Sequence, residues 1–185
     1  MSDYVTTPYG DVKKKILDLA AEVQLLVCDV DGVLSDGLIY MGNDGEELKT
    51  FHTHDGFGIK ALLNAGIDVA VITGRSSNIV QRRMQALGVQ HIYQGQGDKL
   101  PAFEDLLDKL GLTAAQTAYV GDDVIDLPVM QNAALGIAVA NAHPLVLQKA
   151  DWTTRTRGGY GAVREVCDLI LQARDQLDSA QGTSI

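Results

Sequence analysis

The sequence predicts an α/β fold, in which helices cover both faces of a parallel sheet. Two observations support this prediction. Short, continuously apolar runs, typical of strands buried on both faces, alternate along the chain with stretches of helical periodicity. Such alternation favours parallel strands joined by right-handed crossovers. The expected architecture is a Rossmann-like sheet sandwiched by helices.

The individual elements follow from this pattern in chain order. Apolar runs predict strands at 24–28, 69–73 and 117–120, with a weaker one at 135–139. Periodic stretches predict helices at 11–23, 56–64, 76–87, 99–110, 127–132, 144–149 and 161–177. Gly66, Gly88 and Gly111 stand where three of these helices should end, as left-handed C-terminal caps.

One segment, residues 36–54, breaks the alternation. Residues 38–41 and 47–52 are strand-like, and the sequence Gly-Asn-Asp-Gly at 42–45 is a hairpin turn signal. We therefore expect a small β-hairpin inserted after the first strand. Because no repeat or low-complexity linker divides the chain, we expect a single domain over residues 1–185, with a flexible tail at 178–185.

Composition excludes several classes of partner. The 185 residues carry 15 basic and 24 acidic side chains, a net charge of −9, which argues against binding to nucleic acid or an anionic membrane. Cys28 and Cys167 lie in apolar stretches, so disulfide scaffolds and cysteine-rich zinc sites are not expected. The polar N-terminus does not resemble a secretory signal. We expect a cytoplasmic protein.

Polar side chains follow each of the three strong apolar runs. Ligands of parallel sheets bind at the carboxyl ends of the strands, so these side chains should meet at one edge. A lone Asp-x-Asp is usually a solvated turn, but here it directly follows a buried run. The residues expected at this edge are Asp29, Asp31, Thr73, Gly74, Arg75, Lys99, Asp122, Asp123 and Asp126.

Five crowded carboxylates would repel one another and raise each other's pKa values. A divalent cation relieves that repulsion, and a site of oxygen ligands favours Mg²⁺ over Zn²⁺. Mg²⁺ held by a few carboxylates commonly binds a phosphate as well. Thr73 could donate to phosphate oxygens, and Lys99 supplies a positive charge. We expect Asp123 and Asp126 to support or cap the site, and the whole to be a phosphoryl-transfer site.

Four motifs resemble those of the haloacid dehalogenase-like hydrolase superfamily. They are Asp29-Val30-Asp31, Thr73-Gly74-Arg75, Lys99 and the run from Gly121 to Asp126, in the superfamily's order. A narrower resemblance, to the phosphatases of 3-deoxy-D-manno-octulosonate 8-phosphate, is carried by residues 55–60, 121–130, 141–144, 161–167 and 182–185. This resemblance implies a phosphatase of lipopolysaccharide precursor synthesis.

The resemblance also implies a role for each residue of the motifs. Asp29 would attack phosphorus and form an aspartyl-phosphate. Asp31 would protonate the leaving oxygen and then activate water. Mg²⁺ would bind Asp29, the Asp31 carbonyl and Asp122. Thr73, Gly74 and Lys99 would hold the transferring phosphoryl group.

Substrate contacts and assembly are implied by the same resemblance. His54 and Tyr160 stand where the family often has arginine. The insertion is too short for a cap domain, so the resemblance suggests a homotetramer in which hairpins associate and a neighbour's C-terminal segment helps to close the pocket. Arg83 could instead lie on a solvated helix face. The expected contacts of an acidic sugar phosphate are Asp31, His52, Thr53, His54, Asp55, Gly56, Lys60, Arg75, Arg83 and Lys99.

Three alternatives are weighed against this function. A phosphatase of N-acylneuraminate 9-phosphate or a related sugar phosphate would share the capless frame. A receiver-like phosphoacceptor domain also combines acidic residues, Thr and Lys around Mg²⁺. However, its phosphoacceptor follows a middle strand, whereas Asp29 and Asp31 follow the first. A catalytically silent regulatory subunit is disfavoured by the complete set of motifs.

Overall fold

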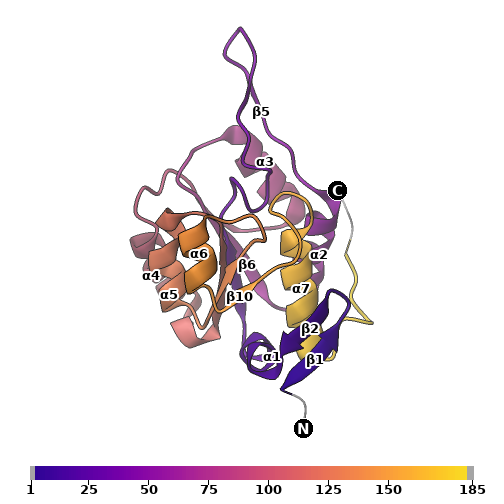
Figure 1. The fold of residues 1–185 in the computed structure, drawn as a ribbon. Coiled ribbons are helices and arrows are strands. Elements are labelled where there is room, and N and C mark those ends of the chain that lie inside the picture. The colour runs from indigo at the N-terminus through magenta and orange to yellow at the C-terminus, as the bar shows by residue number, and fades with distance from the viewer. Residues whose placement is uncertain (1–2, 183–185) are drawn as a thin grey trace.

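A six-stranded parallel sheet forms the centre of the computed structural model, which describes residues 3–182 (Figure 1). This confirms the predicted fold class. The strand order is β10-β9-β8-β3-β6-β7. The strands are β3 (Leu25–Cys28), β6 (Asp68–Ile72), β7 (His91–Tyr93), β8 (Thr117–Gly121), β9 (Leu135–Ala138) and β10 (Trp152–Thr153).

The register of the central strands decides where the polar side chains meet. Every residue of β3, β8 and β9 is buried, as expected for strands covered on both faces. Cys28 at the end of β3 lies opposite Val71 of β6 and Val120 of β8. Asp29, Thr73 and Asp122 therefore leave the sheet at nearly the same level along one edge.

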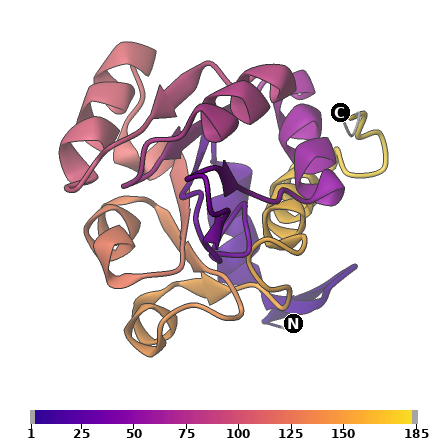
Figure 2. The same cartoon turned by 90° about the horizontal axis from the view of Figure 1, so that it is seen from above.

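Helices cover both faces of the sheet, as the two views in Figures 1 and 2 show. Helices α4, α5 and α6 lie on one side of the sheet, and α1, α2 and α7 lie on the other. The predicted glycine caps are confirmed, because Gly66, Gly88 and Gly111 all have positive φ. The helices are α1 (Lys14–Ala21), α2 (Thr53–Asn64), α3 (Asn78–Leu87), α4 (Leu100–Leu110), α5 (Leu127–Asn132), α6 (Pro144–Lys149) and α7 (Ala162–Ala173), with short 3₁₀ turns η1 (Ala114–Gln116) and η2 (Val124–Asp126).

Several elements differ from the predictions. The predicted helix at 11–23 begins only at Lys14, because the preceding residues form an antiparallel hairpin of β1 (Tyr4–Thr7) and β2 (Gly10–Lys13). Strands β7 and β10 were not predicted. Helix α2 begins at Thr53 instead of residue 56, because the ring nitrogen Nδ1 of His52 accepts a hydrogen bond from the backbone of His54. Helix α7 ends at Ala173, four residues early.

The predicted inserted hairpin is present and projects from the sheet edge as an arm (Figure 1). Its paired strands, β4 (Tyr40–Met41) and β5 (Glu47–Leu48), are shorter than predicted. Seen from above, the arm stands near the middle of the molecule (Figure 2). We call residues 36–52, which lead from the first sheet strand to α2, the arm.

The described part of the C-terminal tail lies against α2. The side-chain amide of Asn64 donates to the carbonyl of Gln181 at 2.7 Å, and Gly182 lies close to Phe57. Residues 183–185, part of the segment predicted to be flexible and part of the family resemblance, lie outside the described residues. Within residues 3–182, no helix has the length and apolar character needed to span a bilayer.

Candidate active site at the carboxyl edge of the sheet

A pocket of ≈ 280 Å³ opens at the carboxyl edge of the sheet. It brings together most of the residues that the sequence predicted for phosphoryl transfer. Gly37 and Ile125 complete its walls. The residues lining it are Asp29, Asp31, Gly37, Thr73, Gly74, Arg75, Lys99, Asp122, Asp123 and Ile125.

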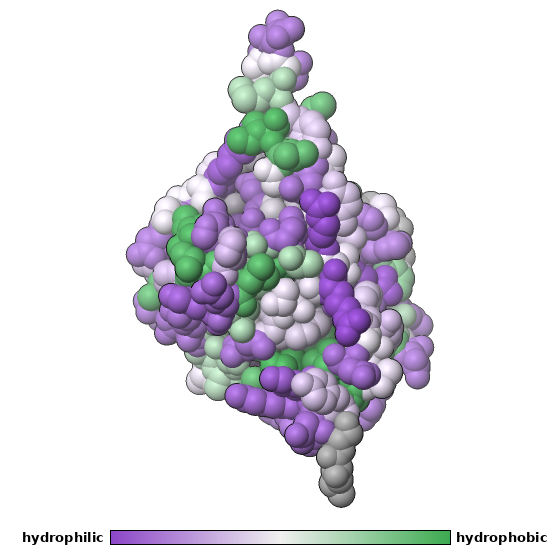
Figure 3. All heavy atoms as spheres, in the orientation of Figure 1, coloured by the Kyte–Doolittle hydropathy of each residue, from purple (hydrophilic) through white to green (hydrophobic). Residues whose placement is uncertain are grey.

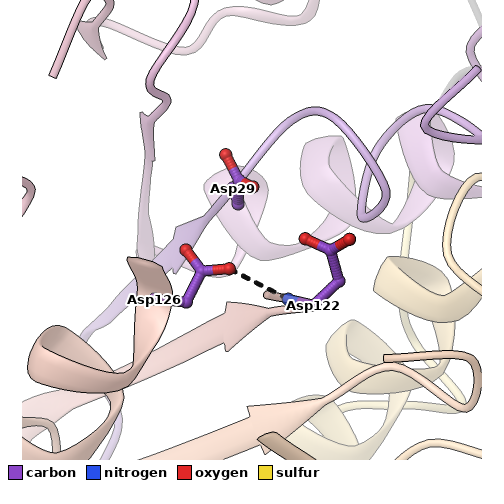
Figure 4. A group of neighbouring side chains, drawn as sticks. All are labelled: Asp29, Asp122 and Asp126. Carbon is purple, nitrogen blue, oxygen red and sulfur yellow. Dashed lines mark hydrogen bonds between the residues drawn. The ribbon is translucent and has the colours of Figure 1, made fainter. Parts of the chain in front are cut away.

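Asp29 and Asp122 both line this pocket and lie close together, with Asp126 beside them (Figure 4). One carboxylate oxygen from each, and one from Asp126, all lie within 4.8 Å of one another. Burial, and then the negative charge of Asp126, raise the pKa of Asp29 to about 6. Burial and the charge of Asp29 raise the pKa of Asp122 to about 8. Burial is the larger cause for both groups, and the mutual repulsion expected of crowded carboxylates adds to it.

Lys99 lies beneath the carboxylates and is almost completely buried. Its Nζ atom is 2.9 Å from Asp29 Oδ1 and 2.7 Å from Asp126 Oδ1. Burial alone would lower the pKa of Lys99, but the two carboxylates outweigh that effect and raise it. The lysine therefore stays charged and fixes the carboxylate of Asp29.

Asp126 supports the site from below. Its Oδ1 also accepts a hydrogen bond from the hydroxyl of Tyr119 at 2.7 Å. Its Oδ2 accepts from the backbone N–H groups of Asp122 and Asp123, at 3.0 and 3.1 Å, the first of which Figure 4 shows. Asp123 accepts from the backbone of Val124 at 2.7 Å. Both oxygens of Asp126 are thus engaged by the protein, which fits a supporting role.

Thr73 and Gly74 also line the pocket. The buried Thr73 directly follows β6, and its backbone N–H donates to the carbonyl of Tyr93 at 2.9 Å. Strand β7, which was not predicted, therefore fixes this residue. Arg75, the next residue of the lining, donates through Nη2 to Glu47 Oε2 of the arm at 3.0 Å.

Two residues of the arm that were not predicted, Glu47 and Lys49, lie beside the site. The ammonium group of Lys49 donates to Asp31 Oδ1. Glu47 lies between Lys49 and Arg75 and contacts both. The sequence signal for these two residues was the pair of opposite charges at 47 and 49. They lie on a hairpin that follows the Asp-x-Asp motif.

The predicted substrate residues of α2 and α3 do not line this pocket. His52, Asp55, Gly56 and Arg83 line a separate, much smaller cavity between the two helices. Thr53 and His54 are exposed, and Lys60 is half-buried away from the pocket. The first turn of α2 instead contacts α7 through Asp55.

Asp55 has a structural partner in α7. Its Oδ1 accepts from the backbone N–H of Arg164 at 2.8 Å. Burial raises the pKa of Asp55 to about 6. Asp55 thus ties α2 to the first turn of α7.

Asp29 and Asp122 fit a hard divalent cation. The Oδ1 atom of Asp122 is buried and has no hydrogen-bond partner, a costly state unless a cation binds it. Oxygen ligands at the edge of an open pocket suit Mg²⁺.

Comparisons with known proteins agree with this geometry. The model of the haloacid dehalogenase-like hydrolase family matches residues 89–165. The chain is 56% identical to 3-deoxy-D-manno-octulosonate 8-phosphate phosphatase KdsC of Yersinia pestis over 182 residues. The aligned residues make up 98% of this chain and 97% of the relative. The Escherichia coli K12 protein of the same name is 55% identical, covering 98% and 96%.

Solved structures show the same likeness. The crystal structure of the Yersinia pestis phosphatase superposes with a TM-score of 0.97 and covers 98% of each chain. The Moraxella catarrhalis phosphatase, in complex with magnesium, phosphate and KDO, is 46% identical and has a TM-score of 0.87, covering 89% of this chain and 95% of its own.

Proposed function

Because the chain belongs to the haloacid dehalogenase-like hydrolases, and among them to the 3-deoxy-D-manno-octulosonate 8-phosphate phosphatases, we propose that it releases phosphate from this acidic sugar phosphate. The observation that carries the proposal is the pocket in which Asp29, Asp122 and Lys99 converge. The reaction is a Mg²⁺-dependent phosphomonoester hydrolysis that supplies a lipopolysaccharide precursor.

The mechanism assigns two steps to the two acids after β3. Asp29, held by Lys99 at 2.9 Å, attacks phosphorus, and the bond to the sugar oxygen breaks while Asp31 donates a proton to that oxygen. Asp31 then takes a proton from water, which attacks phosphorus and breaks the bond to Asp29. Phosphate leaves, and both acids return to their starting states.

The remaining pocket residues hold the charge of the reacting group. Asp29, the Asp31 carbonyl and Asp122 would bind Mg²⁺, which neutralises negative charge on the phosphoryl oxygens. Thr73, Gly74 and Lys99 hold the phosphoryl group in line with the attacking carboxylate. Arg75, which lines the same pocket, would pair with a charge of the substrate.

Phosphate release from a panel of esters tests this function. We expect Mg²⁺-dependent turnover of 3-deoxy-D-manno-octulosonate 8-phosphate that EDTA abolishes. Asp29→Asn should lose activity by about 10³-fold or more, because an amide does not form the aspartyl-phosphate. Asp105→Asn, an exposed ion-pair residue of α4, is the control.

Two results would contradict the proposal. Sustained turnover by Asp29→Asn, or by protein treated with EDTA, would rule out the mechanism. A preference for N-acylneuraminate 9-phosphate over 3-deoxy-D-manno-octulosonate 8-phosphate would contradict the proposed substrate.

We further propose that the chain is one capless domain that works as a homotetramer in the cytoplasm. Supporting this, the arm exposes apolar side chains, which Figure 3 shows as green patches below its hydrophilic tip. Such patches commonly mark protein interfaces. Both cysteines are free and buried, as is usual in reducing compartments.

A further inference from the structure

Lys49 is an unusual residue for a solvent-exposed arm. Only 2% of its side chain is exposed, whereas its neighbour Leu48 is 67% exposed. Its ammonium group donates to Asp31 Oδ1. Because taking a lysine out of water is costly unless its charge is paired, the contact with Asp31 explains why the side chain is directed inward.

The contact belongs to a row of charges that joins the arm to two residues of the pocket lining. Glu47 Oε1 lies 4.0 Å from Lys49 Nζ, and Glu47 Oε2 accepts from Arg75 at 3.0 Å. Asp31 and Arg75 both line the pocket. The arm is thus fastened at two points, and Lys49 contacts the acid to which the proton transfers are assigned.

We propose that Lys49 is a positioning residue for Asp31, a role that rests on the proposed phosphatase function. By binding one carboxylate oxygen, Lys49 restricts rotation of the carboxyl group and leaves the other oxygen for proton transfer. The orientation of the Asp31 carboxyl group matters in both steps, since Asp31 must first give its proton to the sugar oxygen and then take one from water. Proton transfer requires the two heavy atoms to be within hydrogen-bond reach.

The main test compares three lysine variants on the octulosonate phosphate. Lys49→Met keeps the length of the side chain but removes its charge, and we expect kcat to fall about 10- to 100-fold while KM changes less than about 2-fold. Lys49→Arg should recover most of kcat. Lys14→Met is the matched control, because Lys14 forms an exposed ion pair with Asp18.

An aryl phosphate gives a second readout that a purely structural role would not produce. p-Nitrophenolate is a weak base and leaves without a proton, so Asp31 is needed only in the second step. In Lys49→Met we expect a rapid burst of about one p-nitrophenolate per active site, followed by slow turnover.

The outcomes separate the two proposals. A wild-type protein inactive on the sugar phosphate would contradict the proposed function. An active wild type with unchanged kcat in Lys49→Met would overturn the role of Lys49, and so would a rise in KM alone. A fall in melting temperature that accounts for the lost activity would also overturn it. If Lys49→Met does not fold, Lys49→Gln carries the same test.

Discussion

At the scale of single residues, the site is made of acids whose charged forms are costly to bury in the metal-free protein. Asp122 has a buried oxygen with no hydrogen-bond partner, and its pKa is raised from 3.8 to about 8. Lys99 offsets the charge of Asp29 and Asp126, but no described cation contacts Asp122. The free energy of folding therefore depends on the protonation of Asp122 until a metal binds.

Asp122→Asn should stabilise the metal-free protein increasingly as the pH rises from 5 to 8. Since the folded-state pKa lies above the unfolded-state pKa, the contribution of Asp122 to stability is full below about pH 4 and is lost as the pH rises through 8. Compared with wild type, the variant should therefore gain melting temperature progressively from pH 5 to pH 8, by an amount equivalent to roughly a few kcal/mol.

Calorimetry with and without Mg²⁺ completes this test. Mg²⁺ should raise the melting temperature of wild type at pH 8 and have little effect on Asp122→Asn, because the ligand is lost. Asp123→Asn, whose side chain is exposed, should keep the response to Mg²⁺. A melting-temperature difference between Asp122→Asn and wild type that does not vary with pH would contradict the assignment.

At the scale of elements, α7 holds the loop that supports the Asp31 turn. The buried Glu165 accepts hydrogen bonds from the backbone N–H groups of Arg155 and Thr156, both at 2.9 Å. The loop beyond them packs directly on the turn: the backbone N–H of Gly159 donates to the carbonyl of Val33 at 2.8 Å. A helix at the end of the chain thus supports a catalytic turn near its beginning.

Gly158→Ala should disrupt this support. An added Cβ atom would lie 1.7 Å from the backbone oxygen of Gly32, which cannot move without shifting the Asp31 turn. We expect urea unfolding to show a decrease of about 1–3 kcal/mol in the free energy of unfolding. We also expect kcat to fall about 10-fold or more. Gly97→Ala has open space around it and should behave like wild type. Unchanged kcat in Gly158→Ala would show that the turn does not depend on the loop.

The sequence predicted those elements whose signal is local. Strands β3 and β8 are fully buried, so their apolar runs are continuous, and the acids that follow them could be placed at one edge. Strand β10 has two residues and forms only by pairing with β9, a tertiary contact without a local pattern. For the same reason, neither the contact of Lys49 with Asp31 nor the turn of Asp55 toward α7 could be derived from spacing.

At the scale of the whole molecule, an acidic chain must bind a negatively charged substrate. The net charge is −9, yet the basic groups of Arg75, Lys99 and Lys49 are gathered around one pocket. Together with Mg²⁺, they would make the field locally positive. The pocket is open on one side, and the arm beside it exposes apolar side chains, which favours closure by a second copy of the chain.

Leu38→Glu tests this assembly. Leu38 is 60% exposed on the arm, and a charge there should disfavour burial in an interface without disturbing the core. Light scattering should give about four times the 19.8 kDa chain mass for wild type and a smaller species for the variant. Leu145→Glu, on a similarly exposed leucine of α6, should remain tetrameric. A monomeric wild type at micromolar concentration would contradict the proposal, whereas a variant that dissociates and loses sugar-phosphate turnover, but keeps its melting transition, would show that the open pocket needs its neighbours.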